Sequence, residues 1–281
     1  MSKSAPLRAF ALNHMTVPSL NCTALFDLAR SLDCIGIELR NDLSGRRLFD
    51  GDSPETVKAA LRATGLRLLA LAEVKRFNDW SSGTEAAALA LIKTAVAAGA
   101  EAVSLIPVND GTGCGNGERQ ANLRVALRAL KPDARRSRSD RPGSSPLGFG
   151  ICSLRHKEEA IDAIEALGAT GRFKLIHDTF HHFLAGEQQL FPGHTGIVHL
   201  SGVVDPKVSV GEMRDPHRVL VDAHDRIGNV EQIRALRAAG YDGPVSFEAF
   251  APEVHRLDDQ KSALAGSIAF IGKALTGEQR G

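Results

Sequence analysis

The sequence has almost no net charge, few cysteines and no long apolar run. Lysine and arginine together number 34 against 33 aspartate and glutamate residues, which gives a formal net charge of +1. A chain this close to neutrality has no global field that would hold a nucleic-acid backbone or an anionic membrane. We therefore expect no nucleic-acid partner and no membrane partner, and a small uncharged ligand fits better.

The cysteines argue against a metal knuckle and against a disulfide framework. Cys22, Cys34, Cys114 and Cys152 show neither Cys-x-x-Cys pairing nor regular spacing, so reduced thiols are the simplest interpretation. No run approaches the roughly 18 apolar residues of a membrane span, and the N-terminal stretch lacks the apolar core of a signal peptide. These absences predict a soluble, cytoplasmic protein.

The residues that are present suit one large α/β domain. A length of 281 residues is normal for an α/β barrel, a fold that typically needs about 250. Hydrophobic residues make up 43% of the chain and charged residues 24%, which is enough apolar material for a large core. We predict a single domain over residues 1–281.

Short apolar runs alternate with helical periodicity along the chain, which favours a parallel sheet. Strands are predicted at 8–12, 35–39, 66–74, 102–108, 173–177, 196–202 and 245–250. Helices are predicted at 22–32, 54–64, 84–98, 119–130, 157–167, 187–191, 230–239 and 259–275. Glycines follow several helix ends, and Ser53-Pro54 begins a helix in the usual way. One strand is therefore missing between Lys131 and Lys157.

The segment that should supply this strand, residues 133–145, reads DARRSRSDRPGSS. Both faces of a parallel barrel strand are covered and need apolar side chains, so this composition argues against a buried strand. A solvated loop insertion is one interpretation, and a basic phosphate-binding patch is another. We expect the segment to be irregular or weakly paired, leaving the barrel open or poorly sealed between its fourth and sixth strands.

Polar residues at the ends of three later strands suggest a metal site. Asp178 ends FKLIHD, His199 lies in GIVHLSG and Glu248 ends GPVSFE. Taken singly, Asp178 could be a helix N-cap and His199 a hydrogen-bonded surface residue. Glu248 is harder to explain in such a way, because burying a carboxylate without a partner costs several kcal/mol. Carboxylates with an imidazole and no thiolate suit Mn, Mg, Co or Zn. The conjunction predicts a divalent-metal site at the C-terminal strand ends.

Five segments carry a family resemblance: IGIELR at 35–40, HDTFHHF at 177–183, VHLSG at 198–202, RDPHRV at 214–219 and AGYDGPVSFEAFAPE at 239–253. With these segments the chain resembles the xylose-isomerase-like TIM-barrel family of sugar isomerases and epimerases. It is most similar to inosose (2-keto-myo-inositol) isomerases, and less so to tagatose and psicose 3-epimerases. The resemblance covers nearly the whole chain except 133–145, and it implies a (β/α)8 barrel.

The resemblance also implies roles for individual residues. The family binds its metal through Glu, Asp, His and Glu, and the last three map onto Asp178, His199 and Glu248. His181, Arg218 and Glu38 match positions that line the substrate site. Manganese is the metal that the resemblance favours, with Mg, Co or Zn as alternatives, and Glu248 is also the expected general acid/base.

The first metal-binding Glu of the family is missing. Relatives have a Glu-Pro-Leu-Gly-Phe-like segment after the fifth strand, whereas this chain has Ser145 followed by Pro-Leu-Gly-Phe. Because the length is preserved while the composition of 133–145 is foreign, a compensated pair of frame shifts is a third interpretation of the segment. On this view Ser145→Glu alone should do little, since its supporting strand is absent.

The expected activity is isomerisation or epimerisation of a small polyol or keto-sugar through an enediolate, as in inositol catabolism, impaired by the loss of one ligand. One rival is a phosphodiesterase resembling endonuclease IV, which needs more metal ligands and a basic DNA face. Another is a non-catalytic sugar-binding barrel with a degraded metal site. The sequence leaves homo-oligomer formation open.

Overall fold

The computed structural model describes residues 9–115, 117–131 and 141–277. In this described part, eight strands close into a barrel, each paired with its neighbours in chain order. They are β1 (Phe10–Asn13), β2 (Gly36–Arg40), β3 (Arg67–Lys75), β4 (Ala102–Ile106), β5 (Arg141–Ser144), β6 (Lys174–Asp178), β7 (Thr195–Leu200) and β8 (Val245–Phe247). All of the pairings are parallel. The predicted TIM-barrel fold is thus confirmed.

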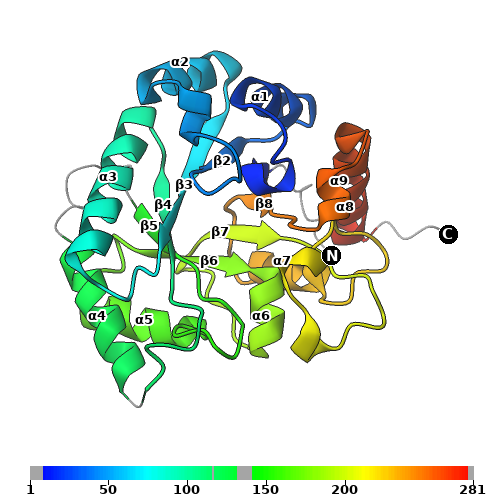
Figure 1. The fold of residues 1–281 in the computed structure, drawn as a ribbon. Helices are drawn as coiled ribbons and strands as arrows, with labels where there is room; N and C mark the ends of the chain where they lie inside the picture. Colours follow the sequence, from blue (N-terminus) through cyan, green and yellow to red (C-terminus); the bar gives the residue numbers. More distant parts are fainter. Residues whose placement is uncertain (1–8, 116, 132–140, 278–281) are drawn as a thin grey trace.

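Helices surround the strands (Figure 1). They are α1 (Cys22–Ser31), α2 (Pro54–Thr64), α3 (Ser82–Ala98), α4 (Glu118–Leu130), α5 (Lys157–Ala166), α6 (Thr179–Ala185), α7 (Asn229–Ala238), α8 (Pro252–His255) and α9 (Gln260–Thr276). Short 3-10 turns are η1 (His14–Thr16), η2 (Leu48–Gly51), η4 (Val210–Glu212) and η5 (Asp215–His217). Within the residues described, no helix combines the length and apolarity that crossing a membrane requires.

Most predicted elements lie within a few residues of the observed ones, but one helix was misplaced. The helix predicted at 187–191 is wrong, because that stretch is not helical and α6 begins directly after β6. The Asp178 side chain caps α6 by accepting hydrogen bonds from the backbone N–H groups of Phe180 and His181, and Gly186 ends the helix with φ +69°. The cap brings His181 to the C-terminal end of the barrel.

Two apolar layers hold the barrel together. The larger layer lies between strands and helices and includes Leu12, Leu71, Leu105 and Phe247, all almost fully buried. A small inner layer consists of Ala11, Leu69, Ile176 and Ile197. The interior above this inner layer, toward the C-terminal strand ends, holds polar side chains instead.

The expectation of an open barrel between β4 and β6 is wrong. β5 pairs with β4 at four positions and with β6 at two, and the Ser145 N–H continues the pairing by donating to the Leu105 carbonyl at 3.1 Å. The physical reason is that the hydrogen bonds between strands are made by main-chain groups. A strand with few apolar side chains can therefore still pair with β4 and β6. The remainder of the anomalous segment, 133–140, lies outside the described residues.

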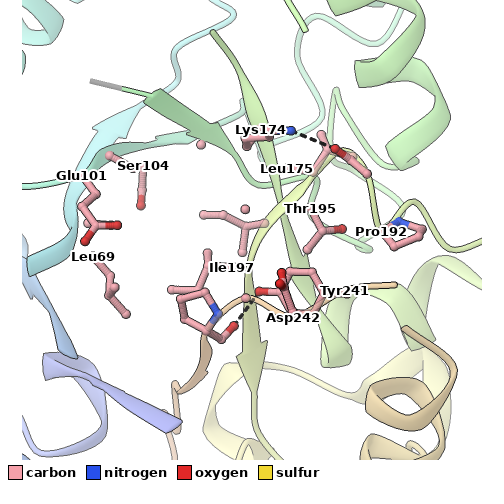
Figure 2. A pocket seen from close by; sticks show the side chains of 18 of the residues that line it. Leu69, Glu101, Ser104, Lys174, Leu175, Pro192, Thr195, Ile197, Tyr241 and Asp242 are labelled. Atoms are coloured by element: carbon pink, nitrogen blue, oxygen red, sulfur yellow. Dashed lines mark hydrogen bonds between the residues drawn. The ribbon is translucent and has the colours of Figure 1, made fainter. Parts of the chain in front are cut away.

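Side chains do not fill the barrel completely at its N-terminal end, next to β5. A cavity of about 600 Å³ lies at the N-terminal strand ends, lined by Leu69, Ser104, Gly143 and Ile197 among others, and Figure 2 shows the side chains around it. Gly143 contributes no side chain to this space. Because reactive groups of this fold gather at the opposite end of the strands, we interpret the cavity as a packing defect and not as the functional site.

Candidate active site

A second cavity, of about 370 Å³, lies at the C-terminal strand ends. Its lining includes residues from the ends of six strands or within three residues after them: Arg40, Glu73, Asn109, Asp178, His199 and Glu248. Ser145, which follows β5, also lines it. Parallel strands deliver all of these side chains to one mouth, which is where a barrel of this kind carries its chemistry.

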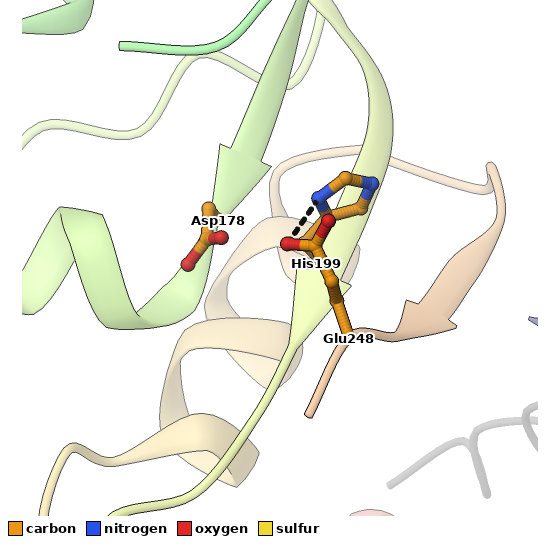
Figure 3. A group of neighbouring side chains, drawn as sticks. All are labelled: Asp178, His199 and Glu248. Carbon is orange, nitrogen blue, oxygen red and sulfur yellow. Dashed lines mark ion pairs between the residues drawn. The ribbon is translucent and has the colours of Figure 1, made fainter. Parts of the chain in front are cut away.

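Asp178, His199 and Glu248 meet in this cavity, as the sequence predicts. Each offers a ligand atom within 4.8 Å of the others, and all three residues are buried. Figure 3 shows them converging from β6, β7 and the end of β8. The register explains the convergence, because Asp178 pairs with His199 and His199 pairs with Ser246, two residues before Glu248 on the same face.

His199 is held between two carboxylates. Its Nε2 lies 3.0 Å from Glu38 Oε2, and its Nδ1 lies 3.0 Å from Glu248 Oε2. Burial works to lower the pKa of His199, but the two carboxylates outweigh it and hold that pKa well above its ordinary value. A carboxylate on one ring nitrogen is the usual way to orient an imidazole so that its other nitrogen can bind a metal.

Glu38 lies behind His199 and does not line the cavity. It is fully buried, and its second oxygen accepts a hydrogen bond of 2.5 Å from the Ser246 hydroxyl. The sequence-based assignment of Glu38 to the substrate site therefore does not match its position. Its contacts suit a residue that orients His199.

Glu248 is surrounded by donors. Its Oε1 accepts hydrogen bonds from Arg40 at 2.9 Å and from Asn13 at 3.1 Å, and its Oε2 accepts one from Arg218 at 3.0 Å. Burial would raise the pKa of Glu248, but His199, Arg218 and Arg40 together hold that pKa well below the usual range. The carboxylate is thus ionised and fixed in orientation.

Arg218 spans two of the three predicted metal ligands. Its Nη2 donates to Asp178 Oδ2 at 2.7 Å as well as to Glu248, and its Nε donates to the Ser201 hydroxyl at 2.9 Å. The side chain is 1% exposed, with its guanidinium 4.5 Å from the Phe250 ring centroid. Arg218 borders the cavity, as the sequence predicts, but protein groups already hold its donors.

His181 reaches the same cavity from the first turn of α6. It is buried, its ring packs edge-on against Phe149 with centroids 5.1 Å apart, and its Nδ1 has no hydrogen-bond partner among the described residues. A buried polar atom without a partner is costly, so a bound ligand that hydrogen-bonds to it would gain affinity. Asp178, which caps this helix, is both a structural cap and a member of the candidate site.

Three residues to which the sequence assigned no role also line the cavity. Arg40 donates to Asp42 and to Glu73 as well as to Glu248. Burial raises the pKa of Glu73 despite the nearby guanidinium of Arg40. Asn109 has a buried Oδ1 without a hydrogen-bond partner among the described residues. Their positions at strand ends were visible in the sequence, but their contacts were not.

The charges around the cavity fit a divalent cation. Six carboxylates line it, from Asp42, Glu73, Asp110, Asp178, Asp215 and Glu248, against four permanent cations, from Arg40, Lys75, Arg76 and Arg218. His199, whose pKa is held well above its ordinary value, adds a further positive charge, and the lining still keeps an excess of carboxylates that favours a cation. Asp178, His199 and Glu248 supply the oxygen and nitrogen donors that Mn, Mg, Co and Zn accept.

The fold and this site define a class: α/β barrels with a carboxylate and imidazole cluster at the C-terminal mouth. The sequence profile of the xylose isomerase-like TIM barrel family matches residues 26–273, and the chain belongs to that family. The resemblance inferred from the sequence is thereby confirmed. No curated protein matches the sequence significantly.

Solved structures share the fold over nearly the full chain. A xylose isomerase domain containing protein from Salmonella typhimurium has 27% identity and a TM-score of 0.87, covering 96% of this chain and 98% of its own. The IolI protein, solved with a bound zinc atom, has 17% identity and a TM-score of 0.79, covering 97% and 100%. D-allulose 3-epimerase from Methylomonas sp., solved with D-allulose, has 15% identity and a TM-score of 0.67, covering 99% and 98%.

Proposed function

We propose that the protein is a divalent-metal-dependent isomerase or epimerase of a neutral keto-polyol, such as a keto-inositol or a ketose. The observation that carries the proposal is the convergence of Asp178, His199 and Glu248, buried at the mouth of the barrel. These three residues would hold the ion, with Mn as the first choice. The zinc bound to the IolI protein and the D-allulose bound to the Methylomonas epimerase support a metal and a sugar ligand in this fold.

When bound, the ion would supply a Lewis acid that polarises a ketone oxygen. Glu248 then removes the proton from the carbon next to the carbonyl, and the electron pair of that C–H bond moves into the carbon skeleton to form an enediolate. Returning the proton to the neighbouring carbon, while the hydroxyl proton passes to the former ketone oxygen, moves the carbonyl. Returning it to the other face of the same carbon inverts that centre. Arg40 and Asn13 hold the Glu248 carboxylate in place for both transfers.

Glu73 is our candidate for the second acid/base group. It borders the same cavity, and the raised pKa of this buried carboxyl suits a group that has to hold a proton at one stage. The family places a Glu after the fifth strand, where this chain has Ser145, so a second carboxylate has to come from another strand. Arg40 contacts both Glu73 and Glu248 and thereby links the two groups.

The proposed substrate contacts are His181 and Arg218. The unpartnered Nδ1 of His181 suits a substrate hydroxyl, and Arg218 borders the cavity beside Asp178. Glu38 would act indirectly by orienting His199. Because carboxylates outnumber cations around the cavity, a phosphorylated or nucleic-acid substrate is disfavoured. The four unpaired cysteines support a cytoplasmic location.

One observation favours a second function, a sugar-binding barrel without catalysis. Arg218 pairs with Asp178 and Glu248 and thereby takes the place that a metal ion would take between them. Ser145 adds no carboxylate to bind an ion. In that case the cluster would be neutralised by protein groups alone. Metal binding separates the two functions.

The test is a calorimetric titration with Mn²⁺ together with an isomerase assay on keto-inositols and ketohexoses. The proposal predicts stoichiometric Mn²⁺ binding and turnover that both disappear in His199→Gln. The control is His194→Gln, which removes a histidine paired with Glu165 away from the cavity and should change neither. Sugar binding without Mn²⁺ binding would favour the non-catalytic barrel.

A further inference from the structure

A third cavity adjoins the candidate active site. It has a volume of about 560 Å³ and lies between the segment after β5 and the segment before α7. Asn109, Phe149 and Asp215 line both cavities, so the two spaces are neighbours across a shared wall. We call this third cavity the side groove. Its walls are formed by residues 148–151 and 210–215.

The side groove is lined by exposed apolar side chains. Ile151 is 55% exposed, the highest value for a large hydrophobic residue in the described part of the chain, and Val210 is 46% exposed. Both line the groove together with Leu184 and Met213. Two exposed aliphatic side chains in one concave surface are a stronger sign of a binding site than scattered ones.

The arginines of the side groove contact its walls. Arg155 donates to the backbone carbonyls of Gly148 and Leu184, each at 3.0 Å. Arg214 donates to the carbonyls of Gly211 and Met213 at 2.8 and 2.7 Å. Each guanidinium thus holds a wall of the groove with part of its donors, while Ile151 and Val210 supply the exposed apolar surface beside them.

The shared wall carries a group that needs a ligand. Asn109 Oδ1 is buried and has no hydrogen-bond partner among the described residues. A hydroxyl at the junction of the two cavities would supply the missing donor. An occupant that spans the junction therefore needs a polar part with hydroxyls on the active-site side and an apolar part on the groove side.

We infer that the substrate is a keto-polyol ring carrying an apolar substituent, such as an aryl or alkyl glycoside of a keto-sugar, with the ring in the active-site cavity and the substituent in the side groove. This inference rests on the proposed function and narrows its substrate class. A free monosaccharide would leave the groove and its apolar surface unused. Burial of an aryl group should strengthen binding by at least tenfold, since apolar burial contributes about 25 cal/mol per Å².

The test compares methyl β-D-glucoside with phenyl β-D-glucoside by calorimetry at saturating Mn²⁺. Both lack the ketone, so they serve as unreactive analogues that differ only in the apolar substituent. We expect the phenyl glycoside to bind at least tenfold more tightly, and Ile151→Asp or Val210→Asp to remove most of this gain while leaving methyl glycoside affinity unchanged. Val125→Asp is the matched control, because Val125 is 50% exposed but lies on α4 outside both cavities. It should leave the gain intact.

Equal affinity for the two glycosides would overturn the inference, as would a phenyl gain that Ile151→Asp and Val210→Asp do not reduce. If a second copy of the chain fills the groove instead, sedimentation will show a dimer that Ile151→Asp dissociates, and that result also overturns the inference. If methyl glycoside binds but the phenyl group adds no affinity, the role of the side groove is refuted while the proposed function stands. If neither glycoside binds, the proposed polyol site fails and the inference fails with it.

Discussion

Arg218 is the residue that most directly opposes ion binding, because its guanidinium contacts two of the three candidate ligands. Arg218→Met should raise Mn²⁺ affinity at least tenfold, since it removes a cation that competes for the oxygens of Asp178 and Glu248. Without metal the variant should be less stable by about 3–5 kcal/mol, because two buried carboxylates lose their partner. Thermal unfolding with and without Mn²⁺ measures both effects.

The control is Arg67→Met, which removes an exposed arginine paired with Glu101 at the opposite end of the barrel. It should leave the Mn²⁺-induced rise in unfolding temperature unchanged. A smaller Mn²⁺ effect in Arg218→Met than in the parent protein would show that Arg218 supports the ion instead of competing with it.

Ser145 is the second residue at which the ligand set can be altered. The sequence predicts that Ser145→Glu alone does little, but that prediction assumed an absent strand, whereas Ser145 follows a paired β5 and lines the cavity. We now expect Ser145→Glu to strengthen Mn²⁺ binding at least tenfold by adding a charged oxygen ligand. Ser145→Gln, which has nearly the same size but no charge, should not, and equal titrations of the two variants would refute this expectation.

At the scale of elements, β5 borders the cavity at the N-terminal strand ends through Gly143. A Cβ added at Gly143 would lie 3.5 Å from the nearest atom of Ile176, an ordinary contact beside an open cavity. Gly143→Ala should therefore stabilise the fold by about 1 kcal/mol, through better filling and a less flexible unfolded chain. Denaturant unfolding tests this value.

Gly196 provides the matched control for this prediction, because it lines the same cavity on β7. A Cβ at Gly196 would come within 2.9 Å of the Lys174 Cβ, so Gly196→Ala should destabilise the protein. If both alanine variants lower stability, the space below β5 is not a packing defect.

The junction of α5 and α6 depends on a buried ion pair. Lys157 contacts Glu187 and lies 2.8 Å from His182 Nδ1. Burial would raise the pKa of Glu187, but hydrogen bonds from His182 and Lys157 outweigh it and lower that pKa to about 2. The folded-state pKa is thus below the unfolded value, so the stabilisation is fully present above about pH 4.5 and is lost as the pH falls toward 2.

Glu187→Gln should therefore lower the free energy of unfolding by about 3 kcal/mol at pH 7, and this difference from the parent protein should shrink below pH 4.5. Glu165→Gln, at an exposed pair with His194, should show no such pH dependence. Urea unfolding between pH 3 and 7 provides the measurement, and a constant difference across this range would contradict the assignment.

The sequence predicted most elements because apolar periodicity and helix caps are local signals. The strand 245–250 and the helix 54–64 coincide with β8 and α2 at their starts, since Pro244 and Ser53-Pro54 mark them. Two elements failed for different reasons. The helix after β6 was misplaced because the possible N-cap at Asp178 was not used to set its start. The strand β5 was missed because its pairing depends on the edges of β4 and β6.

At the scale of the whole molecule, the barrel assembles a site that no segment of sequence contains. Asp178, His199 and Glu248 could be found from the sequence because each follows apolar residues of a predicted parallel strand. The position of Glu38 behind His199 and the bridge made by Arg218 could not, because they depend on contacts between residues 161, 40 and 30 positions apart. Sequence patterns thus identified the candidate ligands but not the groups that tune them.

The most direct test of the claim that this barrel works through an enediolate is to follow the exchange of the proton on the carbon next to the ketone. We would incubate the protein with Mn²⁺ and a keto-inositol in D₂O and record proton NMR spectra over time. The account predicts that deuterium enters at the carbon next to the carbonyl, that exchange requires Mn²⁺, and that Glu248→Gln abolishes it. Absence of exchange with every keto-inositol and ketohexose tried, in a protein that binds Mn²⁺, would contradict the claim that this barrel transfers protons through an enediolate.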